Sequence, residues 1–148
     1  MIGVDTNILI YAHRSDSPWH AAALQSLSRL AESGRAWAIP WPCIHEFLAI
    51  STHPRIFSPP TPMRDAILAV ESWMQAPTLR LLGETEGYFG LLQQLLEHAH
   101  VQGPVVHDAR IAALCLQHGV SELWTADRDF GRFRGLRVHN PLPGADER

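Results

Sequence analysis

The stretch MIGVDTNILIYA, residues 1–12, decides the fold of this chain. Apolar residues run on both sides of a polar triplet, Asp5-Thr6-Asn7, where a buried segment should have no polar residue. An ionised carboxylate in such a place is costly unless it is paired, hydrogen-bonded or bound to a metal ion. We therefore expect a buried strand to end at Asp5 and a short helix to follow it, with Asp5 kept there for a reason other than packing.

Helical and strand patterns alternate along the rest of the chain. Periodicity and turn residues predict strands over 1–5, 36–40, 79–82, 122–126 and near 136–140, and helices over 6–12, 16–34, 41–51, 62–75, 84–100 and 107–119. Asp16 and Pro18 are typical of a helix start, and the proline-rich stretch 54–62 is expected to be a loop. Strands separated by helical segments predict an α/β fold with a mostly parallel sheet.

The composition limits the class of protein. A chain of 148 residues, 46% of them hydrophobic, predicts a single domain over 1–148 with its own core. Cys43 and Cys115 form no CxxC pair, which argues against a structural zinc site and a disulfide framework. The sequence shows no basic leader and no apolar run approaching about 18 residues, so we expect a cytoplasmic protein that does not enter a membrane.

The charged residues are unusual in one respect, because all twelve basic residues are arginine. A formal net charge of −3 argues against a broad cationic surface for nucleic acid, although a narrow one is still possible. The lack of lysine excludes mechanisms that need a Schiff-base lysine or a P-loop lysine. Arginine remains available to grip phosphates in a bidentate manner and to stack on bases.

Four carboxylates lie at the ends of predicted elements or on an apolar helix face. Asp5 and Asp127 end or follow strands, Asp108 opens a helix, and Glu46 lies on the apolar face of another. Each alone has an ordinary explanation, such as a helix dipole for Asp108, a turn for Asp127 or an arginine partner for Glu46. In open parallel sheets, however, ligands bind outside the carboxyl ends of the strands, so at least three of the four are expected at one end of the sheet.

Carboxylates gathered in one place repel each other unless a cation holds them. Oxygen ligands alone select a hard ion, Mg²⁺ or Mn²⁺, and Mg²⁺ is commonly completed by substrate phosphate oxygens. Such a site supports phosphodiester hydrolysis, in which metal ions activate a water and stabilise the leaving oxygen. Bound metal also reverses the local field, so that an acidic protein can accept a polyanionic substrate.

Four separated blocks, GVDTNILIYA, IHEFLAI, VVHDARIAALCLQHGV and LWTADRDFGRF, carry these acids. With them the chain resembles the PIN-domain ribonucleases, and within that group the VapC-type toxins of bacterial toxin–antitoxin pairs. The resemblance implies a PIN-like three-layer α/β/α fold and a Mg²⁺-dependent endoribonuclease, with Mn²⁺ as the other possible ion. It implies that the metal-binding and catalytic acids are Asp5, Glu46, Asp108 and Asp127.

The same resemblance assigns supporting residues and partners. It implies that Thr6, Asn7 and Thr125 organise the carboxylates by hydrogen bonds, and that Asp129 is an accessory acid that supports its turn. It also implies a homodimer and a cognate antitoxin protein that wraps the toxin and blocks the site. RNA is the substrate that the resemblance implies.

Several arginines follow the last acid. We predict that Arg128, Arg132 and Arg134 contact the RNA backbone, with a solvated rim as the equally plausible alternative. Arg110 is expected to face away from Asp108 along its helix and to pair with a carboxylate.

Parts of the sequence also fit other functions. A catalytically silent PIN-like module that binds RNA or a partner protein stays possible, although such a module has no need of four acids. Aspartyl-phosphate hydrolases need a second Asp where Asn7 stands, and a lysine as well. HD-type phosphohydrolases, suggested by His107-Asp108, are all-helical and bind metal through several histidines, which the predicted strands oppose. His98 and His100 would point to different sides of a helix, so they are expected at the surface.

Overall fold

The computed structural model describes residues 1–144 of the chain. A parallel sheet of five strands lies at its centre, in the order β3-β2-β1-β4-β5. The strands are β1 (Ile2–Val4), β2 (Trp37–Pro40), β3 (Leu79–Leu82), β4 (Glu122–Trp124) and β5 (Arg137–His139). The predicted parallel sheet is therefore confirmed.

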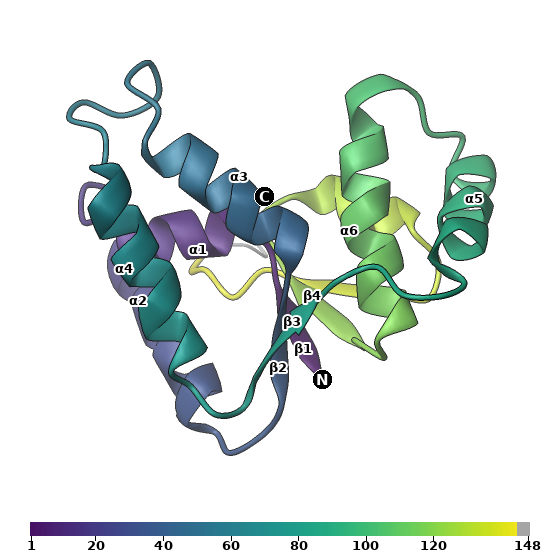
Figure 1. Cartoon of the computed structure of the whole chain (residues 1–148), viewed down its shortest axis with the longest axis horizontal. Coiled ribbons are helices and arrows are strands. Elements are labelled where there is room, and N and C mark those ends of the chain that lie inside the picture. The colour runs from purple at the N-terminus through teal and green to yellow at the C-terminus, as the bar shows by residue number, and fades with distance from the viewer. Residues whose placement is uncertain (145–148) are drawn as a thin grey trace.

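Helical segments connect the strands. They are α1 (Thr6–His13), α2 (His20–Glu32), α3 (Trp41–Ser51), α4 (Met63–Met74), α5 (Tyr88–His98) and α6 (Val106–Gln117), with two short 3₁₀ helices, η1 (Gly103–Val105) and η2 (Arg128–Arg132). Helices α1 to α4 lie on one side of the sheet and α5 and α6 on the other (Figure 1). The three layers expected from the sequence are thus present.

The strand order explains both the layers and the position of the site. The chain passes from β1 to β2 to β3 in one direction and then returns across the sheet to β4, which pairs with β1. Because parallel crossovers are right-handed, this reversal moves the later helices to the opposite face. The reversal also leaves a crevice outside the carboxyl ends of β1 and β4, which is where open α/β sheets bind ligands.

The core covers both faces of the central strands. Val4 on β1 and Trp37 and Ile39 on β2 are fully buried, and Phe47 of α3 and Leu114 of α6 are buried as well. Burying a large apolar side chain stabilises the fold by about 1.5–3 kcal/mol. Strands this deeply buried tolerate no charge along their length, so a carboxylate in this region has to lie at a strand end.

Helix α2 begins later than the sequence predicts, at His20 and not near Asp16. The intervening residues form a turn in which the Ser17 hydroxyl accepts the Trp19 N–H at 3.1 Å and the Ser17 carbonyl accepts the His20 N–H at 3.1 Å. The Asp-Ser-Pro signal therefore marks a turn that precedes the helix. Its carboxylate is used elsewhere, since Asp16 accepts two hydrogen bonds from the Arg14 guanidinium.

Helix α5 is also shorter than the predicted 84–100 and begins at Tyr88. Gly87 adopts a left-handed conformation with φ of 86°, which a helix interior does not accept. The Gln117 side chain of α6 donates to the Glu86 carbonyl at 3.0 Å and so fixes this turn from a neighbouring helix. A contact across the fold sets this boundary, which local periodicity could not reveal.

Two further expectations concern the chain as a whole. Among residues 1–144, no helix is both long enough and apolar enough to cross a membrane. Residues 145–148 of the predicted single domain lie outside the described residues, and the single-domain organisation stays a prediction. His98 and His100 are exposed, as predicted.

Candidate active site

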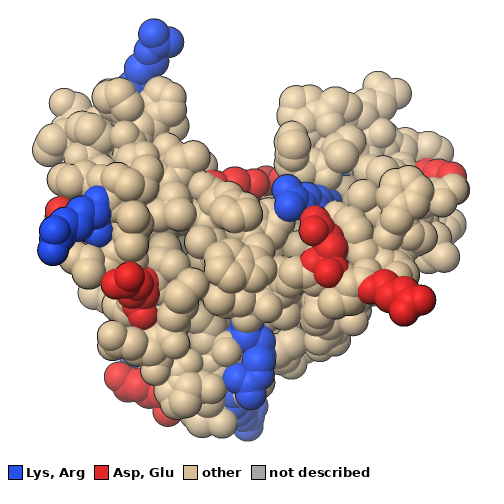
Figure 2. Space-filling model, in the orientation of Figure 1, with Lys and Arg blue, Asp and Glu red and all other residues tan. Residues whose placement is uncertain are grey.

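A cavity of about 300 Å³ lies at the carboxyl ends of β1 and β4. We call it the acidic cavity, because all four carboxylates singled out in the sequence line it: Asp5, Glu46, Asp108 and Asp127. They come from four separate segments, namely the end of β1, α3, α6 and the start of η2. The space-filling view shows the molecule hollowed between the α3 side and the α6 side, with acidic atoms at the floor of the hollow (Figure 2).

Asp5 is the most buried of these acids, with only 4% of its surface exposed. It follows β1 directly and is the N-cap of α1, where its Oδ1 accepts the Thr6 N–H at 2.8 Å. An Asp N-cap satisfies one of the free N–H groups of a helix start, which explains locally why the strand can turn into a helix here. The cap accounts for one carboxylate oxygen and leaves the other to longer-range partners.

The second oxygen of Asp5 is held from the far end of the chain. The Thr125 hydroxyl donates to Asp5 Oδ2 at 2.7 Å, and the Asn7 amide lies 3.3 Å from the same oxygen. Thr125 also accepts the Asn7 amide at 3.0 Å and the Asp127 N–H at 3.0 Å. The Thr125 hydroxyl therefore connects the segment after β1 to the segment after β4.

Glu46 is positioned by the first turn of α1. The Thr6 hydroxyl donates to Glu46 Oε2 at 2.6 Å, across two helices that pack together. The sequence placed Glu46 on an apolar helix face, with an arginine as its ordinary partner. The partner that the structure shows for Glu46 is a neutral hydroxyl and not an arginine.

Cys43 is a member of the site that sequence reasoning missed. It is fully buried on α3, and its Sγ lies 3.6 Å from Asp5 Oδ1, within range of a weak S–H donor. Burial raises the pKa of this thiol well above its ordinary value, and the Asp5 charge adds to the effect. Cys43 is thus a neutral donor to Asp5. Its position one turn before Glu46 on the same helix is the only signal that the sequence offered.

Asp127 and Asp129 lie at the turn that follows β4. Asp127 is the N-cap of η2, and its Oδ1 accepts the Asp129 N–H at 2.9 Å. Asp129 itself is exposed. Asp129 contributes its N–H to the turn, and the accessory role that the resemblance implied for its carboxylate stays a prediction.

Asp108 lies in the first turn of α6 and faces the other acids. Burial raises its pKa above the ordinary value, and the charges of Asp127, Glu46 and Asp129 raise it further. The guanidinium of Arg132 opposes this effect. These mutual influences place the acids within electrostatic reach of one another.

Burial and a neighbouring negative charge also raise the pKa of Asp5, and here the increase is larger. Burial raises the pKa of Asp5 to about 6, and the hydrogen bonds from Thr125 and Thr6 only partly offset it, while the Glu46 charge raises it further. The cavity therefore holds negative charge at a real electrostatic cost. A cation is the partner that would remove this cost.

The three predicted arginines are placed differently. Arg132 acts on Asp108 electrostatically, and Arg128 follows Asp127 and lines a second cavity next to the acids. Arg134 lines a hollow beside α5 and α6 and is not part of the acidic cavity. Arg110 pairs with Glu84, with Nη2 3.3 Å from Oε1, as the sequence predicted.

The donor set fits a hard divalent cation that keeps part of its water shell. Four carboxylates facing one cavity supply the oxygen ligands that Mg²⁺ and Mn²⁺ prefer. In the described part of the chain, however, no three acidic, histidine or cysteine side chains are close enough to form a complete metal cage by themselves. Mg²⁺ is usually bound through one or two carboxylates, waters and substrate phosphates, so this arrangement suits it.

Comparison with known sequences identifies similar proteins. A family model for the PIN domain matches residues 2–136. The chain is 36% identical over 144 residues to Ribonuclease VapC43 of Mycobacterium tuberculosis, a match that covers 97% of each chain. It is 30% identical over 141 residues to Ribonuclease VapC48 of the same species, covering 95% of this chain and 97% of the relative.

Solved structures share the fold at lower sequence identity. The structure of VapBC2 from Rickettsia felis, bound to a DNA fragment from its promoter, superposes with a TM-score of 0.66 at 20% identity and covers 95% of this chain and 98% of that one. The Sarcin-Ricin loop cleaving toxin VapC20 of Mycobacterium tuberculosis gives a TM-score of 0.65 at 17% identity, covering 93% and 99%. The PIN-like architecture expected from the sequence is therefore confirmed.

Proposed function

Since the chain belongs to the PIN-domain family, we propose that it is a divalent-metal-dependent endoribonuclease that uses Mg²⁺ and is the toxin of a type II toxin–antitoxin pair. The observation that carries this proposal is the acidic cavity, in which a buried Asp5 meets three further carboxylates. The ribonuclease names of its relatives, at 30% and 36% identity, support the activity.

The four acids share one role in this proposal. Asp5, Glu46, Asp108 and Asp127 hold the ion, and no lysine is needed for the chemistry. When bound, the divalent cation polarises a phosphoryl oxygen of the RNA and makes a water molecule a better nucleophile. The hydroxyl of Thr125 keeps Asp5 in one orientation, at an oxygen–oxygen distance of 2.7 Å.

Hydrolysis of an RNA phosphodiester adds water across one P–O bond. The hydroxyl of the water joins phosphorus, and a proton passes to the leaving oxygen. No histidine is among the residues that line the acidic cavity within residues 1–144. A carboxylate is therefore the group of this chain that accepts the proton of the attacking water.

The proposal extends to partners. The structural neighbours include toxin–antitoxin complexes, such as one from Klebsiella pneumoniae, and these support an antitoxin partner. We expect that antitoxin to cover the acidic cavity. We place the protein in the cytoplasm as a single domain over residues 1–148, and we expect a homodimer. Expression of the chain alone in a bacterium should arrest growth, and coexpression of the antitoxin should relieve the arrest.

The decisive experiment is RNA cleavage by the purified chain. We expect cleavage with Mg²⁺, none with a chelator, and none by an Asp108→Asn variant shown by circular dichroism to be folded. Asp65→Asn is a matched control, because Asp65 is an exposed acid in the first turn of α4, away from the cavity. This control should cleave at the wild-type rate.

Two outcomes would contradict the proposal. RNA binding that is indifferent to metal, without cleavage, would mean that the acids serve the structure and that the protein is an RNA-binding module. Cleavage that survives both the chelator and Asp108→Asn would place the chemistry elsewhere in the chain.

A further inference from the structure

A second cavity, of about 320 Å³, lies next to the acidic cavity. We call it the aromatic cavity, because Tyr11 and Trp19 form one of its walls. Its volume is within the range of about 300–1,000 Å³ that is usual for small-ligand sites. Resting on the proposed function, we infer that this cavity binds one base of the RNA next to the phosphate that is cleaved.

The aromatic wall is suited to a flat ligand. The rings of Tyr11 and Trp19 have their centroids 5.0 Å apart and are tilted by 48°, so that neither ring is covered face to face by the other. Both residues are only partly buried. Single-stranded RNA is recognised mainly through bases that stack on such aromatic side chains.

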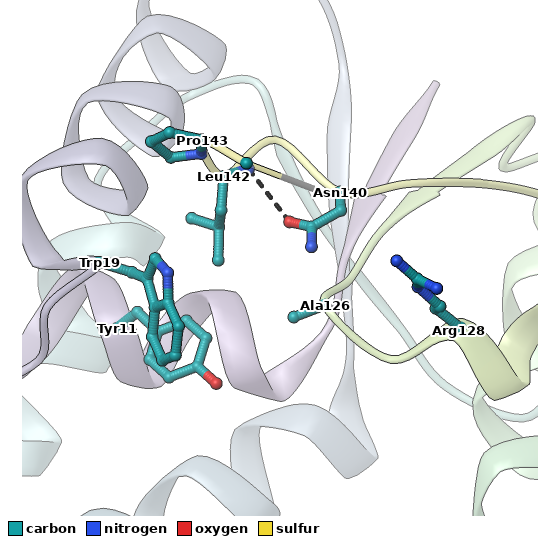
Figure 3. A pocket seen from close by; sticks show the side chains of 8 residues that line it. Tyr11, Trp19, Ala126, Arg128, Asn140, Leu142 and Pro143 are labelled. Atoms are coloured by element: carbon teal, nitrogen blue, oxygen red, sulfur yellow. Dashed lines mark hydrogen bonds between the residues drawn. The ribbon is translucent and has the colours of Figure 1, made fainter. Parts of the chain in front are cut away.

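Asn140 adds a polar group that can recognise the edge of a base. Its Oδ1 accepts the Leu142 N–H at 3.0 Å, which fixes the orientation of the amide. The amide nitrogen then points into the cavity, as Figure 3 shows. Within residues 1–144 this nitrogen has no hydrogen-bond partner, so a donor is available for a base carbonyl or ring nitrogen.

The opposite side of the aromatic cavity carries positive charge. Figure 3 shows Arg128 across the cavity from Tyr11 and Trp19, with Ala126 between them at the base. An aromatic wall with an amide donor beside it matches a base, which is flat and carries hydrogen-bonding groups at its edge. A purely apolar ligand would not use the Asn140 amide donor.

The chain geometry connects the two cavities. Tyr11 lines both of them. Ala126 and Arg128 line the aromatic cavity, whereas Asp127 between them lines the acidic cavity. Asn7 holds the segment 126–128 in place, because its Oδ1 accepts the Ala126 N–H at 3.1 Å. A phosphate placed over the acids therefore has the neighbouring base beside the aromatic wall.

The test is binding of short single-stranded RNA, measured by fluorescence anisotropy with EDTA present so that the RNA is not cut. The probes are pentanucleotides that differ in one base, with an abasic nucleotide at that position as the reference. Trp19→Leu should raise Kd for the base-containing probes about tenfold or more and should leave the abasic probe unchanged. Trp19→Phe keeps a flat ring and should restore most of the affinity.

Two further variants sharpen the result. Trp41→Leu is the matched control, because Trp41 is exposed on α3, stacks with His45 and lines neither cavity. It should bind like the wild type. Asn140→Asp keeps the oxygen that accepts the Leu142 N–H and removes the donor, so it should change the order of preference among the four bases.

The outcomes separate this inference from the proposed function. The base site would be overturned if Trp19→Leu and Trp41→Leu changed Kd equally, or if Trp19→Leu weakened binding of the abasic probe as much as that of the others. A wild-type chain that binds none of the probes would also overturn it. Base-dependent binding without cleavage in Mg²⁺ would keep the base site and refute the nuclease. Metal-dependent cleavage whose base preference is unchanged by substitution of Trp19 and Asn140 would keep the nuclease and refute the base site.

Discussion

At the scale of single residues, Thr125 shows how a neutral side chain organises a charged site. Its hydroxyl lies on a side chain that is 1% exposed, donates to Asp5, and accepts N–H groups from Asn7 and Asp127. Three hydrogen bonds therefore meet at one oxygen atom between two of the candidate metal ligands. Such supporting partners fix the orientation of ligands and tune their affinity for metal.

Removal of this hydroxyl should weaken metal binding more than it weakens the fold. Thr125→Val keeps the branched shape but leaves Asp5 Oδ2 without its shortest hydrogen bond. We expect the affinity for Mn²⁺, measured by calorimetry, to fall about 10–100-fold. Thr52→Val is the control, since the Thr52 hydroxyl donates to the Leu48 and Ala49 carbonyls at the end of α3, away from the acids. Equal Mn²⁺ affinity of Thr125→Val and the wild type would contradict this role.

Asp5 should also make the metal-free protein less stable as the pH rises. Its pKa is about 6 in the folded chain, against an ordinary value of 3.8, so the folded state holds the proton more tightly than the unfolded state does. The free energy of unfolding should then fall between about pH 4 and pH 6, by about 3 kcal/mol at most. Asp5 is still half protonated at pH 6, so the penalty is complete only above about pH 7.

The Asp5→Asn variant isolates this effect. Urea unfolding in EDTA should give a difference in unfolding free energy between wild type and variant that changes across this pH range, because the variant has no carboxyl at this position. Other titrating groups are present in both proteins and cancel in the difference. A difference that is constant from pH 4 to pH 7 would show that burial does not shift the titration of Asp5.

At the scale of elements, the segment that joins α6 to β4 packs closely against β1. Gly3 on β1 faces this contact, and a Cβ built there would lie 3.1 Å from Val120 and 3.5 Å from the Cys115 sulfur. Both neighbours are buried. The strand therefore needs a residue without a side chain at this point for the helix to approach it.

Gly3→Ala should press on Val120 and, through it, displace the adjoining end of α6. Overpacking of this kind costs about 1–3 kcal/mol, and the displaced α6 should slow cleavage as well. Gly90→Ala is the matched control, because Gly90 is an exposed position on α5 where an added Cβ meets no atom within 4 Å. That variant should gain about 0.4–1 kcal/mol. Chemical denaturation of both variants checks the pair, and equal unfolding free energies would contradict the packing argument.

At the scale of the whole molecule, charge is distributed so that an acidic protein can still meet RNA. The formal net charge is −3, and acidic atoms lie at the floor of the hollow in Figure 2. Arg132 and Arg128 lie near this hollow, on the segment that follows β4. Contact with the phosphate backbone is thus expected at a few positions only.

Arg132→Ala should weaken RNA binding and lower the salt dependence. Loss of one phosphate contact should reduce the slope of log K against log salt concentration by about 1. Arg35→Ala is the control, because Arg35 lies beside Met1 and Ile2, near the start of β1 and therefore opposite the carboxyl ends of the strands. Anisotropy titrations at several salt concentrations provide the slopes. An unchanged slope for Arg132→Ala would remove it from the RNA-binding surface.

The sequence by itself determined the parallel α/β sheet and the four acids, because both follow from local patterns: alternating periodicities, helix starts and carboxylates at the ends of apolar runs. Sequence patterns placed the helix over 41–51 correctly, whereas α2 and α5 begin later than predicted. Only the tertiary structure decided those starts, since a glycine with positive φ and a side chain of α6 set the start of α5.

The tertiary structure also decided what surrounds the acids. The hydrogen bond from Thr125 to Asp5 joins residues 120 positions apart, and the aromatic cavity combines residues of α1, the turn before α2 and the end of the described chain. No local pattern marks Asn140 as a member of a site, and Cys43 is marked only by its position one turn before Glu46. Their roles depend on which segments meet at the carboxyl ends of β1 and β4, and packing of the whole chain determines that.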